Sequence, residues 1–434
     1  MEPKRLLYIC DLNLKHGGAQ KNTYKTIGCL SKAFEVVAYI TEEPSPESLD
    51  LLDELQIEFL LDTELDIERL RNVISSKKIS LVLIQYENPD WILAMYRIKK
   101  VLNVRYTLFL HEIPIIGTPT NKFIKCWFIL ASVVYLRYVI QIIFNIKDSK
   151  SISELLTHRN KVSSNGDVGI KNVLFSAISA PLRFLSRILD ILWGLKDAEK
   201  VIAMGPASKF YIDHFLKLKN VIVIEHNAAS DISPDVALER MDFDYDICFM
   251  AARLEPRKGV FDVLEVVREV KKLTNYEVKA VILGRFVDDG TRDIFFRKVR
   301  RLGLESNIYL LGFVSEREKV EILKSSKVFL YPSTKDVFSI SLADALSLGL
   351  PAVVFNVPFV KQFRNTGIYE SRLGDTKNMA RKIAEILALC REEPTEYAKL
   401  RKNVRENFLL NFNWEITCKE QISAIGSIIS NFHN

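Results

Sequence analysis

The chain has 434 residues, of which 48% are hydrophobic and 26% are charged, and its formal net charge is +6. This is an ordinary globular composition, and the length favours two or three domains with a large buried core. The six cysteines show no C-x-x-C spacing and the N-terminus has no apolar leader, so we expect no zinc site, no disulfide framework and no export from a reducing cytosol. The cysteines are Cys10, Cys29, Cys126, Cys248, Cys390 and Cys418.

The positive charge is concentrated in the middle of the chain. Residues 121–220 contain 15 Lys and Arg against 7 Asp and Glu, a local net charge of +8, so the rest of the chain carries −2. Hydrophobic segments accompany this charge, and no aromatic-basic RNA motif is present. The pattern therefore favours a surface that faces anionic lipid over nucleic-acid binding.

Strands and helices alternate in the first part of the chain, which predicts a doubly wound α/β domain. Strands are expected at 5–12, 35–40, 57–60, 79–85 and 105–110, with helices after residue 20 and at 47–55, 66–76 and 91–102. Gly17 and Gly18 follow the first strand, where glycine lets backbone N–H groups approach a phosphate; a plain strand-to-helix turn is the alternative. His111 follows strand 105–110 at the end where ligands bind, although a lone histidine there is more often structural.

About ninety residues separate His111 from the next clear strand, at 200–204. Within them, residues 123–146 form a largely apolar stretch of membrane-spanning length, and residues 175–193 show the pattern of an amphipathic helix. Arg137 lies in the middle of the apolar stretch, which makes a true span costly. We expect two helices lying in a membrane interface, with a buried helical pair as the alternative.

A polar linker near residue 230 predicts the boundary of a second α/β domain, which opens with strand 245–252. Arg253 and Lys258 follow that strand, and Gly259 precedes helix 260–272. Arginine offers a bidentate fork and lysine a point charge, a pair that can neutralise a leaving diphosphate. A solvated basic turn is the alternative. Strands 278–283 and 308–311 each end at a glycine, Gly284 and Gly312, and the second of these precedes Phe313.

The stretch 328–355 carries two carboxylates on either side of a helix start. A strand at 328–331 is followed by Asp336, a helix that carries Asp344, and a strand at 352–355. Backbone N–H groups at the start of that helix form a ready anion site; they belong to Ser339, Ile340 and Ser341. One acid could hold a sugar and the other the ribose hydroxyls of a sugar nucleotide, whereas acids that complement a helix dipole are the alternative.

These motifs together resemble family-4 retaining glycosyltransferases of the GT-B fold (glycosyl transferases group 1). The segments in register with the family signature are Pro332-Ser333, Asp336, Asp344-Ala345, Gly349-x-Pro351 and, earlier, Arg253-x-x-x-x-Lys258-Gly259. Both glutamates of the signature are aspartates here, so each carboxylate reaches about one methylene less. The resemblance covers essentially the whole chain and is strongest over 245–360 and weakest over 112–199.

The resemblance implies two Rossmann-like domains that face each other across a cleft. These are residues 1–229, with a hydrophobic helical insertion at about 120–195, and residues 230–410, followed by a helix at 411–434 that crosses back to the first domain. It implies retaining transfer of a sugar, with Arg253 and Lys258 on the leaving diphosphate, Asp336 on the sugar and Asp344 on the ribose. It also implies donor-side roles for Gly17, Gly18, Gly284, Phe313 and the helix start at 339–341, and places His111 beside the sugar.

We expect no metal and no other cofactor, because Arg and Lys replace the cation in this fold; Asp242-x-Asp244-x-Asp246 resembles a metal motif but is interpreted as solvated acids before a strand. The expected partners are a nucleotide-sugar donor and a polyprenyl-linked or glycolipid acceptor at the cytoplasmic face of a membrane, with no nucleic acid. A soluble glycosyltransferase with a non-lipid acceptor, or an inactive glycosyltransferase-like partner subunit, remains the alternative.

Overall fold

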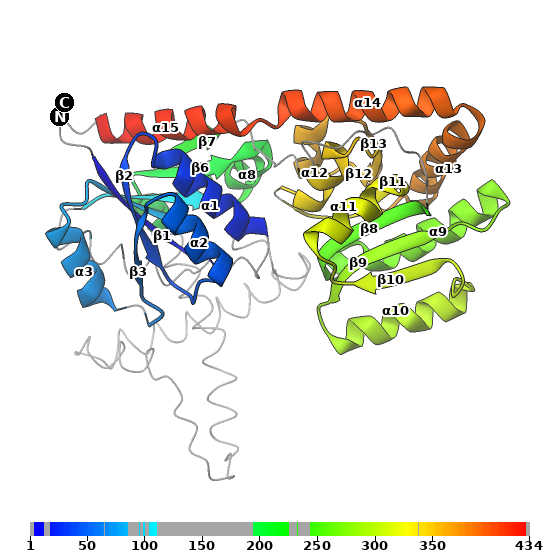
Figure 1. Ribbon diagram of the computed structural model, residues 1–434, viewed down its shortest axis with the longest axis horizontal. Helices are drawn as coiled ribbons and strands as arrows, with labels where there is room; N and C mark the ends of the chain where they lie inside the picture. The colour runs from blue at the N-terminus through cyan, green and yellow to red at the C-terminus, as the bar shows by residue number, and fades with distance from the viewer. Residues whose placement is uncertain are drawn as a thin grey trace, which may run out of the picture.

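Two parallel β-sheets lie side by side, each flanked by helices, in the computed structural model (Figure 1). The structure describes residues 4–12, 18–64, 66–85, 104–110, 194–224, 244–336 and 338–430, together with Met95, Lys99 and Ile232. The predicted hydrophobic insertion at about 120–195 lies almost wholly outside the described residues, and so does the predicted boundary between residues 229 and 230.

The first sheet has seven parallel strands in the order β3-β2-β1-β4-β5-β6-β7. Where the structure describes the connections, helices join consecutive strands, as parallel pairing requires. The strands are β1 Arg5–Cys10, β2 Glu35–Ile40, β3 Glu58–Leu61, β4 Leu81–Gln85, β5 Tyr106–Leu110, β6 Lys200–Met204 and β7 Val221–Ile224. The helices are α1 Gly18–Leu30, α2 Pro46–Glu54, α3 Ile67–Ser76 and α8 Gly205–Tyr211, the last continued by the π-helical turn η3 Ile212–Leu216.

Both faces of this sheet are buried, which is why its strands read as nearly continuous apolar runs. Along β1, Leu6 and Tyr8 join the core that lies under α1, α2 and the last helix, whereas Leu7 and Ile9 join the core under α3 and η3. The alternation follows from the two-residue period of a strand.

The second sheet has six parallel strands in the order β10-β9-β8-β11-β12-β13. These are β8 Tyr245–Leu254, β9 Ala280–Phe286, β10 Ile308–Gly312, β11 Ser326–Tyr331, β12 Ala352–Phe355 and β13 Ile368–Ser371. Helices α9 Val260–Thr274, α10 Asp289–Leu302, α11 Glu316–Lys324 and α12 Ile340–Ser347 connect them, with 3-10 turns η4 Pro256–Lys258 and η5 Pro358–Phe363. Strand β13 was not predicted from the sequence.

Three helices close the chain: α13 Thr376–Glu392, α14 Pro394–Asn411 and α15 Trp414–Ser430. Helix α14 packs against α12 and α13 of the second sheet, whereas α15 packs against α1 and β7 of the first. The two helices run one after the other along one side of both sheets (Figure 1).

A disulfide joins α15 to the first domain. Cys29 in α1 and Cys418 in α15 are both buried and bonded, with their Cα atoms 5.5 Å apart and 389 positions apart in the sequence. The expectation of cysteines without disulfides was wrong for this pair, because spacing along the chain does not show that two distant helices pack together.

No helix among the described residues is long and apolar enough to cross a membrane.

Asp246, interpreted as a solvated acid, is instead buried within β8. Its carboxylate accepts hydrogen bonds from Lys327 Nζ at 2.7 Å and from the backbone N–H of Lys279 at 2.9 Å. It pairs with neighbouring strands, and that interpretation of Asp246 was therefore wrong.

Candidate functional site

The predicted site residues of the second domain gather around the carboxyl ends of β8 and β11. These strands are neighbours, yet the chain leaves β8 toward β9 on one side and leaves β11 toward β12 on the other. This is the switch point of the sheet, where the loops after two adjacent strands diverge and leave a crevice for a ligand. Lys258 follows β8 and Asp336 follows β11, so the crevice lies between them.

Lys258, Asp336 and Tyr331 form one hydrogen-bonded cluster across this crevice. Lys258 Nζ lies 2.5 Å from Asp336 Oδ2, and the hydroxyl of Tyr331, at the end of β11, donates to the same oxygen at 2.7 Å. Lys258 Nζ also lies 3.3 Å from the tyrosine hydroxyl. The lysine and aspartate side chains are only 18% and 14% exposed. The structure thus brings together two residues that the sequence placed 78 positions apart.

Burial and charge set the protonation states in this cluster. Burial alone would lower the pKa of Lys258, but its interactions with Tyr331 and Asp336 outweigh that effect and raise the pKa. Burial, with a smaller contribution from Asp336, raises the pKa of Tyr331 to about 12. At neutral pH, Lys258 is therefore a cation and Tyr331 a neutral donor, the states needed to hold a carboxylate or a phosphate.

The turn that carries Lys258 is fixed against the loop after β11. The backbone N–H of Thr334 donates to the carbonyl of Arg257 at 3.0 Å, and the Arg257 guanidinium donates to the carbonyl of Lys335 at 3.3 Å. Gly259 ends the turn at φ 81°, and a Cβ there would lie 2.3 Å from the carbonyl oxygen of Pro332. The side chain of Arg257 thus supports this loop.

Arg253 lies near the end of β8 and is exposed, in register with Arg285 on β9. The guanidinium of Arg285 lies 4.8 Å from the ring of Phe313, whose side chain follows β10 and is 65% exposed. Gly284, predicted to bind the donor, lies inside β9, where a Cβ would lie 1.8 Å from the carbonyl oxygen of Ala251. The glycine is thus required for strand packing beside the irregular part of β8.

Ser339, Ile340 and Ser341 form the start of α12, as predicted. Ser339 is the N-cap, and its hydroxyl accepts from the backbone N–H of Leu342 at 3.1 Å. The helix geometry gives the N–H groups of Ile340 and Ser341 no acceptor within the helix. They remain a candidate anion site next to Asp336.

Asp344 lies one turn further along α12 and is 4% exposed. Its Oδ2 accepts a hydrogen bond at 2.7 Å from Nζ of Lys319, a buried lysine of α11. Lys319 also bonds to Oε2 of Glu316 at 2.6 Å. The predicted ribose acid therefore belongs to a buried ion pair, which its sequence motif does not show.

Two predicted site residues, His111 and Gly17, lie outside the described residues, and so does Asp242. Gly18 is the first residue of α1, the helix that follows β1 in the chain. Among the described residues no group of three or more His, Cys, Asp or Glu could hold a metal ion. The first-domain part of the site therefore stays a prediction.

Sequence reasoning missed Tyr331 and Lys319. Tyr331 ends the strand that leads to Asp336, so a hydroxyl beside that acid could have been expected from the spacing. The sequence does not single out Lys319 in the same way. Lys319 lies four residues after the Ser315 N-cap, where it resembles the other charged residues of a surface helix. Only the packing of α11 against the second sheet shows that it is buried.

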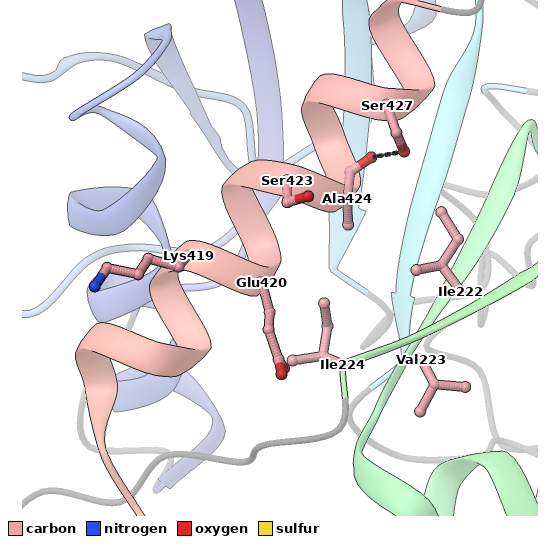
Figure 2. A pocket seen from close by; sticks show the side chains of 8 residues that line it. All are labelled: Ile222, Val223, Ile224, Lys419, Glu420, Ser423, Ala424 and Ser427. Atoms are coloured by element: carbon pink, nitrogen blue, oxygen red, sulfur yellow. Dashed lines mark hydrogen bonds between the residues drawn. The ribbon is translucent and has the colours of Figure 1, made fainter.

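A groove elsewhere in the molecule contains none of the predicted residues. It has a volume of about 590 Å³ and lies between the edge strand β7 and helix α15, where Ser427 donates to the carbonyl of Ala424 at 2.7 Å (Figure 2). It is lined by Ile222, Val223, Ile224, Lys419, Glu420, Ser423, Ala424 and Ser427.

Comparisons with known proteins find related sequences and related folds. Residues 239–407 match the model of the family described as glycosyl transferases group 1. Trehalose synthase of Pyrococcus horikoshii is 25% identical over 240 residues, which cover 54% of this chain and 55% of the relative. The chain thus spans about half the length of that curated relative.

Solved structures resemble the chain over nearly its whole length. A glycosyltransferase from Rickettsia africae superposes with a TM-score of 0.66 at 13% identity, covering 99% of this chain and 100% of that one. The HepE protein of Anabaena, in complex with UDP, superposes with a TM-score of 0.64 at 14% identity, covering 98% and 100%. At such low identity these likenesses show the fold alone.

Proposed function

We propose that the chain, whose residues 239–407 match the model of the glycosyl transferases group 1 and which has the GT-B fold, transfers a sugar from a nucleotide-diphosphate sugar with retention at the anomeric carbon. The observation that carries the proposal is the cluster of Lys258, Asp336 and Tyr331 at the switch point of the second sheet. It offers a fixed cation and a fixed carboxylate in the crevice where α/β sheets bind ligands.

The chemistry follows from these charges. As the bond between the anomeric carbon and the diphosphate oxygen breaks, negative charge grows on the diphosphate, and Lys258 and Arg253 stabilise it. Asp336 accepts hydrogen bonds from the sugar hydroxyls, and the N–H groups at the start of α12 face the phosphates. The acceptor oxygen bonds to the anomeric carbon and its proton passes to the leaving phosphate oxygen. No metal is needed in this proposal.

For the acceptor, we propose a lipid-linked saccharide or polyprenyl carrier at a cytoplasmic membrane face. The support is the sequence of residues 123–146 and 175–193, which combines apolar stretches with basic residues. A soluble sugar is the second candidate, because the relative matched over half of this chain is named trehalose synthase. Both candidates use the same donor site.

The test is nucleotide release from a panel of UDP-, GDP- and ADP-sugars. Each donor is offered alone, with soluble sugars, and with polyprenyl phosphate or diphosphate in anionic vesicles. Release from one donor only with lipid supports the lipid acceptor, and release only with a soluble sugar supports the second candidate. Lys258→Ala should lower release at least 100-fold, since a preorganised charge of this kind contributes on the order of 10²–10³ in rate.

Lys272→Ala is the matched control. Lys272 lies in α9, is 61% exposed and pairs with Glu269 on the same helix. Its loss should leave release unchanged. Absence of both release and nucleotide binding in the unmodified protein would contradict the proposed activity and favour an inactive partner subunit.

A further inference from the structure

Lys319 is a buried cation beside the predicted nucleotide site. Its side chain is 11% exposed and lies between Asp344, which is 6% exposed, and Glu316, which is 66% exposed. Burial would lower the pKa of Lys319, but Asp344 and Glu316 raise it by a larger amount. The ammonium therefore keeps its charge inside the protein.

This ammonium has more donors than acceptors around it. It has three N–H groups, and two donate to Asp344 Oδ2 and Glu316 Oε2. Within the described parts of the chain, no acceptor meets the third. A nearly buried donor without a protein partner is costly, and an oxygen supplied by a ligand would satisfy it.

Stability does not account for the pair either. Two charges lose hydration when they are buried together, and replacing such a pair by apolar residues is often neutral or stabilising. The position is informative instead: α11 follows the turn with Phe313, and α12 begins beside Asp336. Lys319 thus belongs to the same end of the second sheet as the residues proposed to hold the donor.

We propose that Lys319 is a nucleotide-binding residue that selects ribose: its third N–H donates to a ribose hydroxyl oxygen, while Asp344, held by the same ammonium, accepts from the ribose diol. This deepens the proposed function and rests on it. Asp344 is one methylene shorter than the glutamate of the family signature, and the ammonium adds the reach that the carboxylate lacks. A site built to bond hydroxyls rejects an analogue without them, because its own groups are then left unpaired.

The test is calorimetric titration with UDP, GDP and ADP, followed by the 2′,3′-dideoxy analogue of whichever binds best. The unmodified protein should prefer the ribonucleotide at least tenfold. Lys319→Met should weaken binding of the ribonucleotide about tenfold or more and change binding of the dideoxy analogue little, so that the discrimination is lost. Lys319→Arg, which keeps charge and donors, should restore part of it.

Two further variants keep the result interpretable. Lys319→Met leaves Asp344 buried without its cation, whereas Lys319→Met/Asp344→Asn removes both charges and should fold. The double variant should also lose discrimination. Lys324→Met, on the same helix and paired with Glu321, should bind both nucleotides as the unmodified protein does. An equal loss for both nucleotides, or retained discrimination, overturns the ribose role alone. No binding of any nucleoside diphosphate by the unmodified protein overturns the donor site and the proposed function with it.

Discussion

Asp336 receives two donors on one oxygen, and this determines what the residue can do. Lys258 and Tyr331 both bond to Oδ2, so the carboxylate has a fixed orientation before any ligand arrives. Because the carboxylate is already oriented, no free energy is spent on ordering it as charge develops in the transition state. The tyrosine is therefore a positioning residue, acting through Asp336.

Tyr331→Phe tests this interpretation. Loss of one donor to a charged acceptor should cost about 1.5–3 kcal/mol in free energy of unfolding, and nucleotide release should fall about tenfold as Asp336 loses its orientation. The measurements are urea unfolding and initial rates over a range of donor concentrations.

Tyr397→Phe is the matched control for that variant. Tyr397 is also fully buried, and its hydroxyl donates to the backbone carbonyl of Lys327 at 2.5 Å, at the beginning of β11 and far along the strand from Asp336. The Tyr397→Phe variant should have a lower free energy of unfolding than the unmodified protein and an unchanged rate of nucleotide release. Equal rates in Tyr331→Phe and the unmodified protein would show that Tyr331 does not position the acid.

At the scale of elements, the turn η4 and the loop after β11 must touch for the site to exist. Gly259 makes this contact possible, because its left-handed backbone and missing side chain allow Pro332 to approach. The helix α9 that follows then begins directly behind Lys258.

Gly259→Ala should lower the free energy of unfolding by about 2 kcal/mol or more, since a left-handed backbone strains alanine and its Cβ overlaps a carbonyl. Because the overlap displaces the turn, nucleotide release should also be lost. Gly303→Ala is the control: Gly303 is left-handed as well, at φ 63°, but no atom lies within 4 Å of the added Cβ. It should cost about 1 kcal/mol and leave release intact. Loss of release in both variants would contradict the contact argument.

The disulfide between α1 and α15 links the last helix to the first domain. A crosslink across 389 positions restricts the unfolded chain strongly. Cys418→Ser should therefore lower the free energy of unfolding by about 3–5 kcal/mol under oxidising conditions. Reductant should remove the difference from the unmodified protein.

Peptide mapping without reductant checks this disulfide directly. It should yield two disulfide-linked peptides, one that contains Cys29 and one that contains Cys418. Cys390→Ser, a change at a half-buried free thiol, should behave as the unmodified protein does. A pair of unlinked peptides from oxidised protein would show that the two cysteines stay reduced.

At the scale of the whole molecule, buried phenols and ammonium groups should make the fold sensitive to alkali. Burial raises the pKa of Tyr331 to about 12 and also raises the pKa values of Tyr39, Tyr276 and Tyr397. The pKa of Lys258 is raised as well, through Tyr331 and Asp336. All these groups keep their protons to higher pH when folded than when unfolded.

The sign of the pH dependence follows from linkage. Raised pKa values contribute stability that is fully present below the ordinary pKa of 10.0 for tyrosine and is lost as the pH rises through the folded value of about 12. The free energy of unfolding in urea should therefore decrease steadily above pH 10. Tyr331→Phe should show a shallower decrease, and an unchanged slope in that variant would contradict the assignment to Tyr331.

The sequence by itself determined the repeating strands and helices, and it placed Lys258, Asp336 and the start of α12 at the ends of strands. This was possible because parallel strands bring their carboxyl ends to one edge, whatever the distance along the chain. Residues 239–407 match the model of the glycosyl transferases group 1, in agreement with the sequence motifs, whereas family 4 and retention stay predictions. The roles of these residues stay predictions.

Tertiary structure alone decided which side chains meet across elements. Tyr331 joined Asp336, Lys319 was buried against Asp344, and Cys29 reached Cys418. It also showed that Gly284 is needed for strand packing and that Asp246 belongs to a buried ion pair. Periodicity reports which face of an element is buried, but the partner on the other side depends on how separate elements pack, and no local pattern records that.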